Sequence, residues 1–324
     1  MSAGERLRLG LVGCGRLAER AYAPAIARSG RLELVSACDP SPRRRTTIAA
    51  SAGQGPAPAT FATVAELLAG PAIDAVVIAS PVETHVEAAT AAGERGLPCL
   101  VEKPPAACAR EAERLAALSP APAIAFNRRL LLGRGLRERI PRSGGLTVRA
   151  RIDYRRASWD AISVRDDALL DLGSHLVDLA LWLTAAEPLE ASCELAGPDR
   201  AALRLATSRG TCELRCSTAA IHRETVVVRD GDGVVASRRL GGALGLVAGR
   251  LRRGPDALAG SVAEELELFA AAVAGEPAGE LGTAAEGARV MRVLDAARRS
   301  ARLGGAPVAA GRDADARDRD RAPA

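Results

Sequence analysis

A single lysine, Lys103, stands in the stretch CLVEKPPA from Cys99 to Ala106. The chain holds 44 lysine and arginine residues, and all the others are arginine. Arginine stays protonated at any physiological pH, whereas a lysine can lose its proton in a suitable environment, so only lysine can serve as an acid or base. A composition that uses arginine wherever surface charge suffices therefore makes Lys103 a candidate for proton transfer. The alternative is an ordinary surface lysine that has not been replaced by arginine and has no role in chemistry.

Histidine is also rare, with three in the chain, and one lies beside two carboxylates in LLDLGSHLVDLALWL. In a helix, Asp171 and His175 share a face because they are four residues apart, and Asp178 follows three residues later. This spacing predicts that His175 is a general acid or base tuned by Asp171. The alternative is an acid near a helix N-terminus that bonds locally to a histidine.

The stretch LRLGLVGCGRLAERAY has Gly13, Gly15 and Ala18 in a G-x-G-x-x-A arrangement, after a strand pattern and at the start of a helix pattern. The glycines allow a tight turn and the close approach of a pyrophosphate to the helix N-terminus. The next strand pattern ends in LVSACDPSP, where the Asp39 carboxylate can accept both ribose hydroxyls of an adenosine. A dinucleotide site is favoured over a mere tight turn. Asp39 favours NAD, and NADP is the alternative because Arg43–Arg45 follow closely.

The first 125 residues alternate short aliphatic runs with alanine-rich amphipathic segments. The expected strands are 7–12, 32–38, 75–79, 99–101 and 123–126, and the expected helices are 16–28, 64–69, 83–95 and 107–118. This alternation is typical of a parallel sheet covered by helices. We therefore expect an α/β fold whose N-terminal Rossmann domain, a doubly wound parallel sheet, occupies residues 1–125.

The pattern changes after residue 126. A helix-like segment at 131–140, a strand at 146–154 and a helix at 171–184 precede strand-like runs at 189–195, 202–207, 211–217, 225–229 and 234–240. Tight turn signals separate these runs, which predicts an antiparallel arrangement. With closing helices near 261–274 and 283–302, we expect a C-terminal α+β domain over 126–310 with an open, largely antiparallel sheet. The charged, repetitive tail at 311–324 predicts disorder.

The bulk composition excludes several classes of protein. The 324 residues are 48% hydrophobic, enough for two domains and a large core. The net charge of +5 comes from scattered arginines, and aromatic residues make up 2% of the chain. The sequence has no basic stripe interleaved with aromatic rings, so it does not predict nucleic-acid binding. Seven cysteines without a CxxC pair or zinc spacing predict a reduced, cytoplasmic chain with no metal site. No apolar run predicts a membrane span or a signal peptide.

Several short motifs occur in order along the chain. The glycine turn is followed by ASPVETH at 79–85, EKP at 102–104, FNRR at 126–129, DLGSH at 171–175, and the closing EELELFAAAVAGE and VLDAARRSARLGGAPV. This ordered set resembles the glucose-fructose oxidoreductase, inositol dehydrogenase and rhizopine catabolism protein (Gfo/Idh/MocA) family of NAD(P)-dependent oxidoreductases. The resemblance implies hydride transfer at a secondary carbinol or ketone of a sugar, cyclitol or sugar nucleotide. It also implies a homo-oligomer, a dimer or tetramer, formed through the open sheet.

The resemblance assigns roles to residues. It implies that Lys103, Asp171 and His175 line the reacting carbon and that Arg128 contacts the substrate. The residues expected to bind the cofactor are Gly13, Gly15, Arg16, Leu17, Ala18, Asp39, Ser80, Pro81, His85 and Glu102, with Glu102 at the nicotinamide ribose. The loop RDDALLDLG before His175 departs from the family's glycine-rich lead into this helix.

Two other functions stay open at this point. One is a cofactor-binding regulator without catalysis, and the other is a hydrolase that uses tightly held NAD for transient oxidation of a sugar ring. Net NADH formation or loss with a sugar panel indicates an oxidoreductase. Turnover without net NADH change indicates the hydrolase, and cofactor binding without turnover indicates the regulator.

Overall fold

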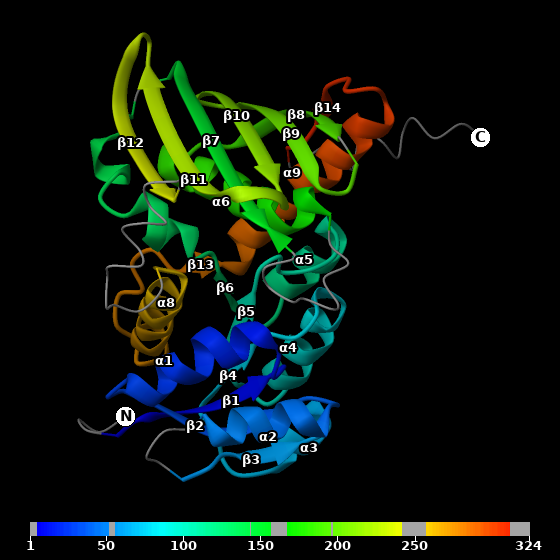
Figure 1. Cartoon of the computed structure of the whole chain (residues 1–324), viewed down its shortest axis with the longest axis vertical. Helices are drawn as coiled ribbons and strands as arrows, with labels where there is room; N and C mark the ends of the chain where they lie inside the picture. Colours follow the sequence, from blue (N-terminus) through cyan, green and yellow to red (C-terminus); the bar gives the residue numbers. More distant parts are fainter. Residues whose placement is uncertain are drawn as a thin grey trace. The chain divides into compact units, whose positions relative to one another are not determined.

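The computed structural model of the chain describes residues 5–51, 56–142, 144–156, 167–195, 197–241 and 257–311. The chain divides into two compact units, Met1–Leu131 with Gly254–Ala288 and Leu132–Arg253 with Arg289–Ala324 (Figure 1). This division differs from the expected boundary at 125, because a segment late in the sequence joins the first unit. Residues 312–324, where the sequence predicts disorder, lie outside the described residues.

The first unit contains a seven-stranded sheet in the order β13-β6-β5-β4-β1-β2-β3. Its strands are β1 (Leu7–Val12), β2 (Leu32–Cys38), β3 (Ala59–Phe61), β4 (Ala75–Ile78), β5 (Cys99–Glu102), β6 (Ala123–Ala125) and β13 (Gly282–Thr283). All neighbours pair in parallel except β13, which pairs antiparallel with β6. The order reverses at β1 and β4, which is the position where doubly wound sheets bind ligands. The predicted Rossmann fold is confirmed.

Helical segments connect these strands. They are η1 (Ala18–Tyr22), α1 (Ala23–Arg28), α2 (Pro42–Ala50), α3 (Val64–Ala69), η2 (Val82–Thr84), α4 (His85–Gly93) and α5 (Ala109–Ala116). Local chemistry sets several of their starts. Proline lies in the first turn of α1 and α2, and Thr63 forms a capping box with Glu66 at the start of α3. The segment η1 is a π-helical turn, a local form that is frequent at functional sites.

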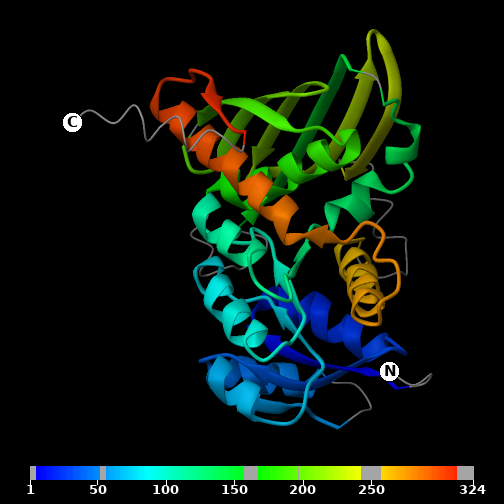
Figure 2. The ribbon, with the colours of Figure 1, turned by 180° about the vertical axis from the view of Figure 1, so that it is seen from behind.

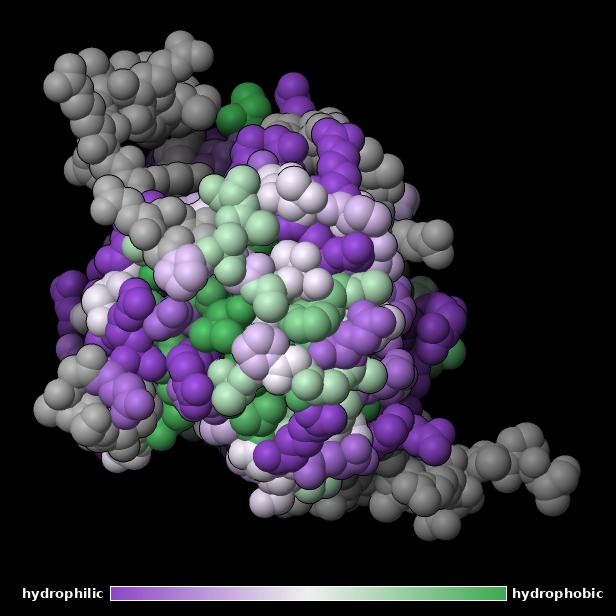
Figure 3. Space-filling view, turned by 90° about the horizontal axis from the view of Figure 1, so that it is seen from below, coloured by the Kyte–Doolittle hydropathy of each residue, from purple (hydrophilic) through white to green (hydrophobic). Residues whose placement is uncertain are grey.

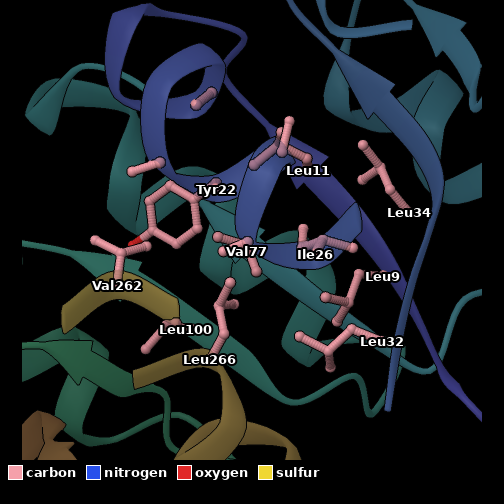
Figure 4. Packing of buried hydrophobic residues seen from close by; sticks show 14 of the residues in the cluster. Leu9, Leu11, Tyr22, Ile26, Leu32, Leu34, Val77, Leu100, Val262 and Leu266 are labelled. Atoms are coloured by element: carbon pink, nitrogen blue, oxygen red, sulfur yellow. The ribbon is translucent and has the colours of Figure 1, made fainter. Parts of the chain in front are cut away.

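The core of the first unit includes α8 (Ala257–Val273), which comes late in the sequence. Val262 and Leu266 of α8 pack with Tyr22, Val77 and Leu100 in one buried cluster (Figure 4). In Figure 2, gold α8 lies beside blue α1, with which it is in contact. This burial of an apolar helix face is what assigns the segment to the first unit rather than to the second.

Among the described residues, no large hydrophobic side chain of the first unit is strongly exposed to solvent. The large hydrophobic side chains that are exposed lie in the second unit: Leu189, Leu195, Ile221, Val234 and Leu303. Figure 3, seen from below the view of Figure 1, shows hydrophilic and hydrophobic residues interleaved on that face. Interleaving of this kind is ordinary for a solvated surface.

The second unit contains another seven-stranded sheet, in the order β12-β11-β7-β10-β9-β8-β14. Its strands are β7 (Leu146–Arg155), β8 (Pro188–Leu195), β9 (Arg200–Thr207), β10 (Gly210–Ser217), β11 (Ala219–Asp230), β12 (Gly233–Gly241) and β14 (Val308–Ala309). Among the described strands of this unit, only β7 and β10 pair in parallel, so the predicted largely antiparallel sheet is confirmed. Buried and exposed residues alternate along β9, as expected when one face of a sheet is covered.

Helical segments cover the buried face of this sheet. They are η6 (Leu169–Gly173), α6 (Ser174–Thr184) and the later part of α9 (Ala284–Arg302). The short turn η4 (Arg137–Arg139) contacts α6, and η3 (Arg129–Gly133) connects the units in the sequence. All residues of α6 are buried, and α6 packs on β7 and β10. The predicted helix at 131–140 is two short turns, one π-helical and one 3₁₀. Among the described residues, no helix is long and apolar enough to cross a membrane.

Candidate functional site

The glycine turn after β1 has the geometry that a dinucleotide needs. Gly13 has φ of +93°, and a Cβ there would lie 2.6 Å from the carbonyl oxygen of Ala79. Only glycine fits this position without displacing the backbone of the neighbouring loop. At Gly15, an added Cβ would meet nothing within 4 Å, so space is open above the turn that precedes η1. These observations fit the close approach of a pyrophosphate to the backbone.

Asp39 follows β2 directly, and its carboxylate is held by two backbone groups. Oδ2 accepts from the Cys14 amide at 3.0 Å, and Oδ1 accepts from the Ser41 amide at 2.8 Å. A guanidinium nitrogen of Arg44 lies 3.8 Å from Oδ2, and Arg45 donates to the Asp39 carbonyl at 2.6 Å. Each carboxylate oxygen has a second lone pair, so the oriented group can still accept ribose hydroxyls.

The other expected cofactor residues of this region lie in the glycine turn after β1 and in the loop after β4. Arg16, Leu17 and Ser80 are half-buried, Pro81 is exposed, and Ala18 is fully buried at the start of η1. Ala18 therefore has no exposed side-chain surface, and its small size serves packing between the turn and the sheet. The side chain of Ser80 is hydrogen-bonded to the Thr84 hydroxyl at 2.6 Å.

His85 is buried and connects two loops of the first unit. Its Nε2 lies 2.9 Å from the Ser80 carbonyl oxygen, and its Nδ1 lies 3.1 Å from that of Pro104. A neutral imidazole has one N–H and can donate to only one carbonyl at a time. Burial lowers the pKa of His85 below its ordinary value, although the carbonyl contacts oppose this. His85 thus links the loop after β4 to the loop after β5.

Glu102 ends β5 and is bound on both carboxylate oxygens. Oε1 accepts from the Tyr22 hydroxyl at 2.7 Å, and Oε2 accepts from the Lys103 amide at 3.0 Å. Burial raises the pKa of Glu102, while the charge of Lys103 and the Tyr22 hydroxyl act in the opposite direction. Lys103 is half-buried and begins the loop that continues through a cis peptide to Pro104. The sole lysine is therefore fixed, through its backbone, to an oriented carboxylate.

Arg128 and Arg129 differ in their surroundings although they are adjacent. Arg128 is half-buried, donates to the Asn127 side chain at 2.9 Å, and its charge favours the ionised form of Glu102. Arg129 is buried, lies 3.1 Å from a Glu286 carboxylate oxygen, and stacks over Phe126. The expected substrate contact, Arg128, is thus the arginine electrostatically coupled to Glu102, and Arg129 belongs to the core.

In the second unit, Asp171 lies in the π-helical turn η6 that leads into α6. Its Oδ2 accepts from the Tyr154 hydroxyl at 2.6 Å and from an Arg156 guanidinium nitrogen at 3.3 Å. Burial and the Asp171 charge raise the pKa of Tyr154 above its ordinary value. His175 and Asp178 follow on α6, and both are buried. Since η6 is π-helical, the regular four-residue spacing assumed for Asp171 and His175 does not apply to this turn.

Tyr22, Tyr154 and Arg156 contact the expected site carboxylates, and no motif pointed to them. The chain has two tyrosines, and both donate to these carboxylates. The rarity that drew attention to Lys103 applies equally to tyrosine and is the signal that could have found them. Among the described residues, no group of three or more histidine, cysteine, aspartate or glutamate side chains could hold a metal ion.

A doubly wound sheet with this glycine turn and this carboxylate defines a dinucleotide-binding protein. Residues 7–121 match the family model described as an oxidoreductase family with an NAD-binding Rossmann fold, GFO_IDH_MocA. The chain is 30% identical over 224 residues to the putative oxidoreductase YceM of Salmonella typhimurium, covering 67% of this chain and 69% of that protein. The chain belongs to the Gfo/Idh/MocA family of oxidoreductases.

Two further similarities extend this assignment. The chain is 32% identical over 195 residues to the rhizopine catabolism protein MocA of Rhizobium meliloti, covering 56% of this chain and 59% of MocA. The match thus spans less than two thirds of that relative. The crystal structure of the WlbA dehydrogenase from Bordetella pertussis, in complex with NADH and UDP-GlcNAcA, has a TM-score of 0.76 at 21% identity, with 95% of this chain and 99% of that chain covered. That likeness shows the fold.

Proposed function

We propose that the protein is an NAD(P)-dependent oxidoreductase that transfers a hydride between nicotinamide and a secondary carbinol or ketone. The observation that carries the proposal is the position of the sole lysine, directly after the buried, oriented Glu102 at the carboxyl end of β5. This end of a doubly wound sheet is where ligands bind. A bound nicotinamide would supply the hydride chemistry, and the protein would supply binding, orientation and proton transfer.

NAD is the favoured cofactor, with NADP as the alternative. The Gly13 and Gly15 turn would receive the pyrophosphate, and Asp39 would accept the adenosine ribose hydroxyls. A 2'-phosphate would meet the negative charge of Asp39, which favours NAD. Arg44 lies near enough to Asp39 to offset part of that repulsion, which keeps NADP as the second candidate.

The proton chemistry is assigned to three residues. His175 would shuttle the proton, Lys103 would hold and polarise the substrate oxygen, and Asp171 would orient them and stabilise their charges. The order of the motifs along the chain supports this assignment. In the second unit, the Tyr154 and Arg156 contacts support an oriented Asp171.

The substrate class is a sugar, cyclitol or sugar nucleotide, with Arg128 as a contact. The WlbA dehydrogenase binds a sugar nucleotide, UDP-GlcNAcA, together with NADH, which supports this class. A homo-oligomer, a dimer or tetramer, is part of the same proposal and rests on the family resemblance. Sedimentation analysis would test the oligomeric state independently of activity.

A substrate panel tested with NAD and NADP in parallel addresses the function. Net NADH or NADPH formation with a sugar or cyclitol, or its consumption with the matching ketone, supports the oxidoreductase. Product formation without net change in NADH absorbance would identify the NAD-dependent glycoside hydrolase. Cofactor binding with no turnover on any substrate would identify the non-catalytic regulator.

A further inference from the structure

Tyr22 is a buried polar residue that the expected site did not include. It ends η1, the π-helical turn that follows the glycine turn, and its side chain has no exposed surface. Its ring packs against the apolar cluster of the first unit, while its hydroxyl donates to Glu102 over a separation of 80 residues. A ring held by packing on all sides places its hydroxyl in one position. The hydrogen bond therefore fixes the direction of the Glu102 carboxylate.

The charged and titratable groups around Glu102 come from several elements. Lys103 and Arg128 favour its ionised form, as does the Tyr22 hydroxyl. From α8, the buried Glu265 interacts electrostatically with Tyr22. Two acidic residues thus act on one tyrosine, and both oppose the loss of its proton. Burial together with these carboxylates raises the pKa of Tyr22 well above its ordinary value, so the hydroxyl stays a donor at every working pH.

We propose that Tyr22 is a positioning residue whose hydroxyl holds Glu102 as an oriented carboxylate and thereby sets the acid limit of cofactor binding. The inference rests on the proposed function, in which Glu102 accepts a hydroxyl of the nicotinamide ribose. An ionised carboxylate can accept the ribose hydroxyl on either oxygen. A protonated carboxyl group carries a hydrogen on one oxygen and so loses part of this acceptor capacity. Tyr22 thus acts on the cofactor through Glu102.

The first test measures NADH affinity against pH by fluorescence titration. In the wild-type chain, NADH affinity should fall at low pH as Glu102 takes up a proton. We call this fall in affinity the acid limb. Tyr22→Phe keeps the ring and removes the donor, so its acid limb should move up by about one pH unit, equivalent to ~1.4 kcal/mol. Affinity on the alkaline plateau should change little. In Glu102→Gln the limb should disappear, and Tyr22→Phe added to Glu102→Gln should cause no further change.

The second test reads the hydrogen bond directly and needs no cofactor. The chain has only two tyrosines, so 3-fluorotyrosine incorporation gives two 19F resonances, and Tyr154→Phe assigns them. The Tyr22 resonance should shift with pH as Glu102 titrates, with a midpoint that matches the acid limb of NADH binding. The pH-dependent shift should be absent in Glu102→Gln. This measurement holds even where Tyr22→Phe fails to fold.

Ser300→Ala controls for a loss of stability alone. The Ser300 hydroxyl is buried in the second unit and accepts from the Cys193 amide at 2.9 Å. Its removal should lower the melting temperature without moving the acid limb. An unmoved limb in Tyr22→Phe, or a limb that persists in Glu102→Gln, would overturn the inference. Absence of NADH binding by the wild-type chain at every pH would instead overturn the proposed function.

Discussion

The Tyr154 hydroxyl lies 2.6 Å from Oδ2 of Asp171, and this short contact joins a strand to the π-helical turn before α6. The relationship repeats that of Tyr22 and Glu102 at 2.7 Å in the first unit. In both cases a tyrosine that resists ionisation donates to a buried acid. Each carboxylate is thereby kept in one orientation by a neutral donor, which leaves its charge uncompensated by that partner.

Tyr154→Phe should lower turnover while the cofactor still binds. The variant removes the hydroxyl that orients Asp171, and Arg156 remains as a donor to the same oxygen. We expect kcat to fall by about tenfold, the equivalent of one hydrogen bond to a charged group. Steady-state kinetics and NADH titration measure the two quantities separately. Unchanged kcat in a folded variant would show that this hydrogen bond does not serve catalysis.

Lys103→Arg should retain the fold and NADH affinity but lose turnover. The guanidinium keeps the positive charge beside Glu102, yet it cannot release a proton. A loss of about 10²–10⁴-fold in kcat is expected where a general acid or base is removed. His175→Asn provides the comparison, since a loss in both single variants without addition in the double variant would indicate one proton pathway. Near-normal turnover of Lys103→Arg would remove the catalytic role of the lysine.

Asp39→Ala should change the choice between the two cofactors. NADH affinity should fall by about tenfold as the ribose hydroxyls lose their acceptor, while NADPH affinity should fall less or rise. Arg44→Ala should act in the reverse direction and weaken NADPH more than NADH. Fluorescence titration with both cofactors measures the ratio. Equal weakening of both by Asp39→Ala would place Asp39 outside the discrimination.

Arg129→Met should lower the stability of the fold, whereas Arg128→Met should weaken substrate binding. Arg129 is buried against Glu286, whose pKa is lowered overall because Arg129 and Thr283 outweigh the effect of burial. Loss of one partner of a fully buried ion pair costs about 3 kcal/mol of unfolding free energy. Because Glu286 is 29% exposed, Arg129→Met should cost somewhat less than this. Arg128→Met should leave stability nearly unchanged and raise the KM for substrate. Urea denaturation and kinetics on both variants would reveal the contrast, and equal destabilisation would contradict it.

Acidification should reduce stability through His85. Burial lowers the pKa of this ring in the folded chain below the 6.5 expected when unfolded, so the unfolded chain binds the proton first. The contribution is therefore complete above the unfolded pKa and is lost as pH falls toward the folded pKa. In urea denaturation between about pH 7.5 and 5.5, His85→Asn should show a smaller decline than the wild-type chain. Replacement of the half-exposed His222 by asparagine is the control, and an equal decline in His85→Asn would contradict the assignment.

The sequence patterns located most elements of both sheets. The predicted strands 7–12 and 32–38 and the helix 64–69 match β1, β2 and α3 in both bounds. The helix α2 and the short strands β3, β13 and β14 were missed. The arginine cluster of α2 is typical of a solvated surface and shows no apolar face. The edge strand β3 has three residues, too few for a hydrophobic periodicity. Periodicity detects an apolar face and is silent about which sheet that face covers, so the packing of α8 was not foreseen.

The candidate site was predictable only where local sequence carries the chemistry. The glycine turn and Asp39 are such features, because strand, turn and helix follow one another in the chain. The contacts of Tyr22 with Glu102 and of Tyr154 with Asp171 connect residues 80 and 17 positions apart. Such contacts depend on the tertiary fold, and spacing along one helix or strand cannot indicate them.

The assignment of α8 to the first unit has a consequence for biosynthesis. The first unit cannot complete its apolar cluster until residues near Leu266 have left the ribosome, after every strand of the second unit's sheet except β14 has been made. Domains usually fold in the order of their synthesis. Here the core of the first unit is completed only after most of the second unit has been made.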